Sequence, residues 1–123
     1  MKLSEIVLKV KEKLEDASEK EITEIVNSLE SKIIADIFIP SGISYEKRVL
    51  DCESDMEASL LLSNDCADFY FYYIMAILAA KDMDITAYEN YNTLFNFAYS
   101  ELSLYFRRNN CPVKQTKIGG RNI

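Results

Sequence analysis

The sequence predicts an all-α fold, a small bundle of about four helices that ends in a long helical hairpin. Apolar side chains recur every three or four residues over long stretches, as they do on the buried face of a helix. Glycine and proline are scarce, with three and two residues, which disfavours a turn-rich β fold. The 123 residues, 49% of them hydrophobic and 28% charged, are typical of one folded domain. We expect a single helical domain over residues 1–112 and a flexible basic C-terminal arm over residues 113–123.

Two helices are expected in the first third of the chain. The first begins at Ser4, whose hydroxyl can cap the first turn, and ends near Asp16. The second begins at Ser18, since Glu21 three residues later completes a capping-box pattern, and it ends before Pro40. The predicted buried face of this second helix consists of Ile22, Ile25, Val26, Leu29, Ile33 and Ile37.

Residues 39–64 show the least regular pattern, and we expect an irregular or β-like arm there. Ser41 and Gly42 indicate a turn. Residues 43–50 are compatible with a short strand, and residues 60–62 with packing on the bundle. A long irregular segment in a compact domain is usually either functional or mobile.

The second half of the chain is expected to fold as an antiparallel helical hairpin. The third helix begins around Asp65, which can cap it. The short loop 81–85 then reverses the chain. The fourth helix begins at Thr86, where Glu89 completes a second capping box, and Pro112 ends it.

The fourth helix carries apolar side chains on more than one side. One stripe has alternating spacings of three and four and should form the seam with the third helix; it consists of Tyr88, Tyr91, Phe95, Ala98, Leu102 and Tyr105. Leu94, Phe97, Leu104 and Phe106 lie off that stripe. We expect Phe97 and Leu104 to contact the second helix or a neighbouring subunit. Aromatic residues at this spacing favour core and subunit interface over a platform for stacking bases, which is the alternative.

The net charge of −6 is unevenly distributed. Residues 107–123 carry five basic and no acidic side chains, whereas residues 1–106 carry nine basic and 20 acidic ones. The basic stretch can bind an acidic neighbour or, alternatively, nucleic-acid phosphates; the acidic body favours the first. The acidic stretch 51–68 follows no calcium-loop pattern, so we interpret it as a solvated surface rather than a metal or acid–base site.

Catalytic chemistry is not indicated by the residue types present. Histidine is absent, and Cys52, Cys66 and Cys111 fit no metal-binding spacing. We therefore expect no enzyme activity, no metal and no cofactor. The first residues show no apolar signal core, and the most apolar run, residues 69–80, is shorter than the roughly 20 residues that cross a bilayer. These patterns favour a protein of the cytoplasm with no membrane partner.

The last two predicted helices carry a specific combination of residues over positions 66–112. In the fourth helix these residues are Tyr88, Asn90, Phe95, Asn96, Ala98, Tyr99, Leu102, Tyr105, Phe106, Arg108 and Pro112. In the third helix they are Asp68, Phe69, Tyr70, Tyr73, Ile74 and Ala76. This combination resembles that of bacteriophage head–tail connector proteins, also called head completion or adaptor proteins, of tailed phages and prophages. The first half of the chain is similar to them only in its layout. Two departures are the turn at 63–65, where the family often has proline, and the bulky Tyr91.

The resemblance implies a structural protein of the virion head–tail junction, present in the host cytoplasm during assembly. Such proteins form a ring beneath the portal, and we expect a dodecameric ring of this chain on the portal. The implied partners are further copies of the chain, the portal protein, and the next connector, stopper or tail protein. Packaged DNA passes through the channel without sequence-specific binding.

Within this hypothesis the assembly interface is expected on the fourth helix. The predicted interface residues are Tyr88, Asn90, Tyr91, Phe95, Asn96, Phe97, Tyr99, Leu104, Arg107 and Arg108. Lys114, Lys117 and Arg121 are the predicted contacts of the basic arm. Two alternatives are a helical nucleic-acid-binding module that uses the basic C-terminal stretch, and a cytoplasmic protein–protein adaptor dimer.

Overall fold

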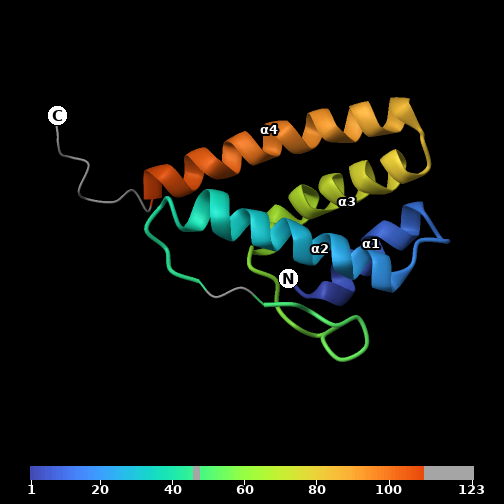
Figure 1. The fold of residues 1–123 in the computed structure, drawn as a ribbon, viewed down its shortest axis with the longest axis horizontal. Coiled ribbons are helices and arrows are strands. Elements are labelled where there is room, and N and C mark those ends of the chain that lie inside the picture. Colours follow the sequence, from blue (N-terminus) through green and yellow to red (C-terminus); the bar gives the residue numbers. More distant parts are fainter. Residues whose placement is uncertain (46–47, 110–123) are drawn as a thin grey trace.

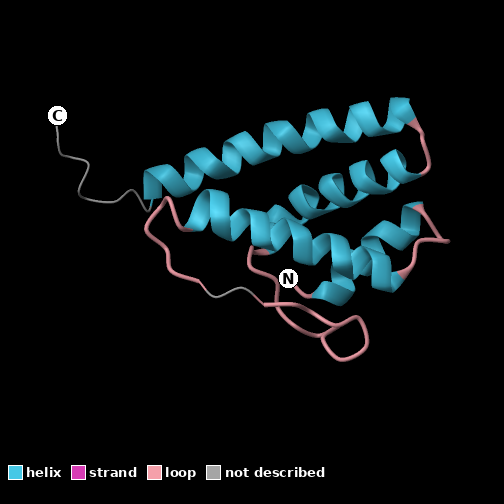
Figure 2. Cartoon of the chain, in the orientation of Figure 1, coloured by secondary structure: helices cyan, strands magenta, loops and turns pink. Residues whose placement is uncertain are grey.

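The all-α prediction is confirmed by the structure, a computed structural model that describes residues 1–45 and 48–109. Four α-helices follow one another as α1 (Leu3–Lys13), α2 (Glu19–Ile33), α3 (Ala67–Lys81) and α4 (Ile85–Asn109). A π-helical turn, Ile34–Phe38, continues α2, and a 3₁₀ turn, Asn64–Cys66, precedes α3. The described residues contain no strand (Figure 2).

Helix α3 lies at the centre of the bundle. It contacts α4 on one side and both α1 and α2 on the other (Figure 1). Because it is enclosed on several sides, it is apolar nearly all round, and three consecutive residues, Phe69, Tyr70 and Phe71, are all buried. The predicted face of α2 is also buried at every one of its six positions.

The predicted hairpin is confirmed, and α4 is its longer arm. Helix α4 runs antiparallel to α3 and continues past the start of α3 to reach the end of α2 (Figure 1). There the ring of Phe106 lies 5.2 Å from the ring of Phe38. Residues 110–112, with the predicted helix stop at Pro112, and the arm 113–123 lie outside the described residues.

Both boundaries of the second predicted helix agree with the sequence prediction. Ser18 Oγ accepts a hydrogen bond from the Glu21 N–H (3.4 Å), and the helical segment ends before Pro40, both as predicted. The cap predicted at Thr86 is wrong. Asp84 caps α4 instead, because its Oδ1 accepts from the Ala87 N–H at 3.2 Å.

Two other predicted starts are also wrong. Helix α1 begins at Leu3, where the N–H groups of Leu3 and Ser4 bond the carbonyls of Ala58 and Met56 and need no serine cap. The helix ends at Lys13, before the end near Asp16 that the sequence predicts. Asp65 does not cap α3, since it lies in the 3₁₀ turn that precedes the helix.

The arm 39–64 is irregular but tightly held where it returns to the bundle. Its β-like alternative is wrong for the described residues, in which the one bridge joins Lys2 to Ser59. The Leu60 N–H donates to the Met1 carbonyl at 2.8 Å beside that bridge. Leu60 and Leu62 are buried, as predicted for the end of the arm.

Candidate interaction surface

The inner side of α4 forms an aromatic seam with α3. The Phe95 ring lies 5.1 Å from the Phe69 ring and 5.0 Å from the Tyr73 ring, centroid to centroid. One turn earlier, Tyr91 meets Phe71 edge-on at 6.0 Å. These pairs show that the three–four stripe of α4 is the seam between the hairpin helices.

The seam encloses the middle of the stripe but not its ends. Phe95 and Leu102 are buried, whereas Tyr88 and Tyr105 at the two ends are exposed. Phe95, predicted as an interface residue, is therefore covered within its own subunit. Tyr91 and Tyr99 are half-buried. The other predicted interface residues are exposed: Tyr88, Asn90, Asn96, Phe97, Leu104, Arg107 and Arg108.

Tyr99 is already committed to contacts within the chain. Its hydroxyl donates to Asp36 Oδ2 at 3.2 Å, and Lys32 Nζ lies 3.1 Å from the same oxygen. Burial and the neighbouring Asp36 carboxylate raise the pKa of Tyr99, and the hydrogen bond from Lys32 lowers the pKa of Asp36. Tyr99 thus ties α4 to the end of α2, which leaves the interface role to other residues.

A second stripe on α4 faces away from the seam, and we name it the outer stripe. Its residues follow at spacings of four, three, four, three and four: Asn90, Leu94, Phe97, Glu101, Leu104 and Arg108. Three of these are apolar yet exposed, with Phe97 at 68% and Leu94 at 44%. A stripe with this repeat is the surface that a helix presents to a packing partner.

A groove runs beside the outer stripe, between α4 and the segment 61–66 that leads into α3. Its volume is about 910 Å³, and its floor is mostly apolar. Its apolar lining includes Leu61, Tyr72, Leu94, Phe97, Leu102 and Tyr105. We name it the α4 groove.

The rim of the α4 groove is acidic. Asp65, Asp68 and Glu101 all line it. Asp68 forms an ion pair with Lys9 (3.3 Å). Neither Asp65 nor Glu101 has a basic partner in the described part of the chain. An apolar floor with an acidic rim fits a partner that is apolar and positively charged.

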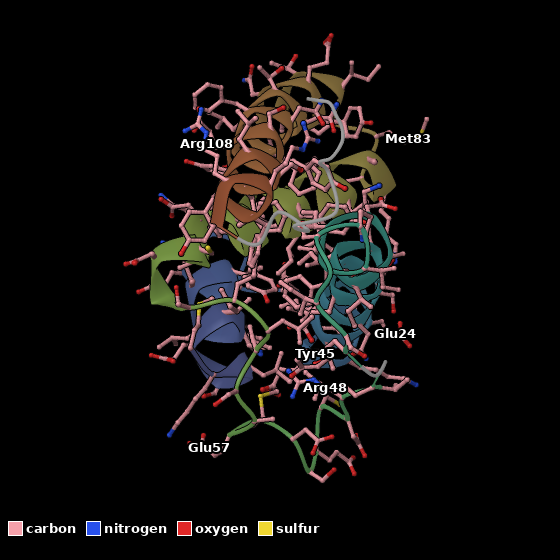
Figure 3. All side chains as sticks on the ribbon, turned by 90° about the vertical axis from the view of Figure 1, so that its left-hand side faces the viewer. Glu24, Tyr45, Arg48, Glu57, Met83 and Arg108 are labelled. Atoms are coloured by element: carbon pink, nitrogen blue, oxygen red, sulfur yellow. The ribbon has the colours of Figure 1, made fainter. Side chains whose placement is uncertain are left out.

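Arg107 and Arg108 lie in the last turn of α4. Both are exposed, and Arg108 lies on the opposite side of the bundle from Arg48 (Figure 3). Cations in the last turn of a helix also interact favourably with its dipole. The predicted arm contacts Lys114, Lys117 and Arg121 lie outside the described residues.

A buried carboxylate that the sequence analysis missed anchors the arm 39–64. Glu30 is 2% exposed, and its Oε2 accepts from the Tyr70 hydroxyl (2.9 Å) and from the Leu61 N–H (2.8 Å). Arg48 Nη2 lies 3.4 Å from Oε1. Figure 3 shows Arg48 on the side of the bundle where the arm lies. The signal in the sequence is spacing: Glu30 follows Val26 by four residues, on the buried face of α2.

Asn27 provides a second anchor one turn earlier on α2. Its Nδ2 donates to the Leu50 carbonyl (3.0 Å), and its Oδ1 accepts from the Leu50 N–H (2.9 Å). The amide thus pairs with the backbone of Leu50 as a neighbouring strand would. Together with Glu30 it holds the arm in a fixed position against α2.

The described ranges contain neither a metal-binding cluster nor a membrane-spanning helix. No group of three or more Cys, Asp or Glu side chains there could hold a metal ion. No helix of this part of the chain is both long and apolar enough to span a bilayer. The thiol of Cys66 lines the α4 groove, and burial raises the pKa of this thiol.

Comparison with protein-family models, with curated proteins and with solved structures found no match to this chain. Its resemblance to phage connectors therefore rests on the residue pattern of α3 and α4.

Proposed function

We propose that the protein is a structural head–tail connector of a tailed phage or prophage. In this proposal it assembles as a ring under the portal, extends the DNA channel and joins head to tail without catalysis. The observation that carries the proposal is the outer stripe of α4 with its adjoining groove. A contiguous exposed apolar surface of this kind is typical of protein interaction sites. The resemblance of residues 66–112 to phage connectors is the basis for proposing a connector ring as the assembly.

Phe97 is the natural anchor of such an interface. It lies at the centre of the outer stripe and is 68% exposed in the single chain. Burying an aromatic side chain of this size contributes about 1.5–3 kcal/mol. Binding energy at interfaces is concentrated in a few central aromatic and arginine residues. Leu94 and Leu104 on either side of Phe97 would extend the same apolar contact.

The charge distribution supports two further parts of the proposal. The acidic body of the chain gives a channel wall that repels DNA phosphates, which lets DNA slide without being held. Arg107 and Arg108 at the end of α4 have no acidic partner among the described residues, so they are available to an acidic surface of the portal or of a neighbouring subunit.

The proposal is tested by binding to a portal. The full chain is mixed with the portal oligomer encoded near its gene, and the complex is followed by sedimentation and negative-stain microscopy. Portal is included because a connector subunit can be monomeric alone and assemble only on its partner. We expect co-sedimentation and a ring on the portal. A chain that never binds the portal, and instead forms a stable dimer, would favour the adaptor alternative.

Two variants locate the interface. Phe97→Glu should abolish binding, because it places a charge at the centre of the apolar contact. The matched control is Ser100→Glu, which adds the same charge at an exposed position of α4 outside the outer stripe. Arg108→Glu should weaken assembly while circular dichroism shows unchanged helical content. Normal assembly of the Arg108 variant would exclude the role given to that residue.

A further inference from the structure

We propose that the α4 groove is the docking site of the chain's own C-terminal segment, residues 110–123, which folds back along α4. This inference rests on the groove and on the composition of the segment. It does not require that the protein be a phage connector.

The segment and the groove are complementary in charge. Residues 110–123 contain Lys114, Lys117 and Arg121 and no acidic side chain. On the rim of the groove, Asp65 and Glu101 are the acidic side chains without a basic partner in the described ranges. Pairing them with the segment neutralises both surfaces.

The segment also has apolar side chains for the apolar floor. Val113 and Ile118 alternate with its cationic residues. Leu94 and Phe97 on the floor expose large apolar areas in the single chain. Covering them removes from water the kind of contiguous apolar patch that isolated chains rarely expose.

The length and origin of the segment fit a fold-back within one chain. Helix α4 ends at Asn109, and Phe106, one turn earlier, lines the near end of the groove. From Phe106 to Leu94 at the far end is about 18 Å along the helix axis. Fourteen extended residues reach about 46 Å, enough for a reversal and the full run. Tethering at the mouth of the groove gives an effective concentration in the millimolar range, which favours the chain's own segment over that of a second copy.

Docking has a consequence for any partner of this face. The segment and a partner cannot both contact Phe97 and Leu94. A partner that binds the outer stripe must therefore displace the segment first, which makes the segment a competitor for that surface.

The native cysteines allow a direct test in the full chain. Cys66 lines the groove, whereas Cys52 lies in the arm 39–64. Alkylation by the neutral reagent iodoacetamide is timed at each cysteine by peptide mass spectrometry. The variant carries Lys114→Glu, Lys117→Glu and Arg121→Glu, all outside the described bundle. We expect Cys66 to react at least threefold faster in this variant, with the rate at Cys52 unchanged.

Electrostatics alone predicts the opposite sign. Removing cations from the neighbourhood of Cys66 disfavours its thiolate and slows alkylation. A faster reaction therefore indicates that the segment no longer covers Cys66. The same acceleration is expected for the unmodified chain at high salt, where ion pairs at the rim are screened.

Two results would overturn the proposal. Equal rates at Cys66 in the two chains mean that the segment does not cover the groove. Protection that strengthens with protein concentration means that the segment of a second copy is bound, not the chain's own. Neither readout involves a portal, so this proposal and the connector proposal can fail independently.

Discussion

Replacing Glu30 by alanine should severely destabilise the bundle. The carboxylate accepts hydrogen bonds from Tyr70 and from the Leu61 backbone, and it pairs with Arg48. Arg48 keeps a second acceptor at the Ser59 carbonyl. The Leu61 N–H, which is part-buried, and the hydroxyl of the fully buried Tyr70 then lose the carboxylate that accepts their hydrogen bonds.

The magnitude follows from the groups left unpaired. Each buried donor without a partner costs roughly 1–3 kcal/mol. The side chain of Arg48 is 33% exposed and keeps its bond to Ser59, so losing its ion pair adds little. For the two donors together we expect a loss of about 4 kcal/mol, which is a quarter or more of the roughly 5–15 kcal/mol that stabilises a typical domain.

The assay is urea unfolding followed by far-ultraviolet circular dichroism, because the chain has no tryptophan. With a slope of about 2 kcal/mol per M, the midpoint of Glu30→Ala should fall by about 2 M. Glu24→Ala, an exposed position on the same helix, is the control and should change stability by less than about 0.5 kcal/mol. A Glu30 variant within about 1 kcal/mol of the parent would refute the reasoning, because the network would then contribute little.

Three further predictions concern the bundle. Phe95→Ala should cost about 3–5 kcal/mol because the ring is buried in the hairpin seam, whereas Phe97→Ala should stay within about 0.5 kcal/mol; urea midpoints of both variants check this contrast, and similar losses would contradict it. Burial, with a carboxylate beside the hydroxyl, raises the pKa of Tyr70 above its ordinary value of 10.0. Above pH 10 the unfolded chain releases this proton and the folded chain keeps it, so stability should fall as pH rises. Tyr70→Phe should flatten that slope in urea midpoints measured between pH 9 and pH 11, and an unchanged slope would show that other tyrosines cause it. Asn27→Ala should remove both bonds to Leu50, and amide hydrogen exchange at Leu50 should rise by roughly 5- to 30-fold; unchanged exchange would mean that the amide does not hold the arm.

Local patterns in the sequence predicted most of the helical fold. The buried face of α2, the cap at Ser18 and the seam through Phe95 all follow from spacings within one helix. The start of α4 could not be placed in this way, because Asp84 and Thr86 both precede plausible first turns. Met83, whose φ is 58°, sets the path of the turn that precedes Asp84, and no pattern in the sequence indicates that angle.

Contacts between distant segments were beyond the reach of pattern analysis. Glu30 and Tyr70 are forty residues apart, and Leu61 and Arg48 lie in an arm with no periodicity to place them. The pattern therefore predicts an irregular arm whose residues 60–62 pack on the bundle, but it does not indicate the hydrogen bonds that attach the arm to α1 and α2.

The candidate surface was predicted only in part, because it also depends on contacts between segments that are distant in the sequence. Phe97 and Leu104 are predicted because they lie off the seam, and Arg108 because it matches the connector pattern; the structure leaves all three exposed. Phe95 was also selected but is buried. Glu101 was missed, because the acidic rim exists only where segment 61–66 approaches α4.

The most direct test of the central claim is co-sedimentation of the full chain with the portal oligomer, compared for the parent, Phe97→Glu and Ser100→Glu. The account predicts that the parent and Ser100→Glu bind the portal and form rings, while Phe97→Glu stays in the supernatant with unchanged helical content. Portal binding by Phe97→Glu equal to that of the parent would contradict the claim that the outer stripe of α4 is the assembly surface.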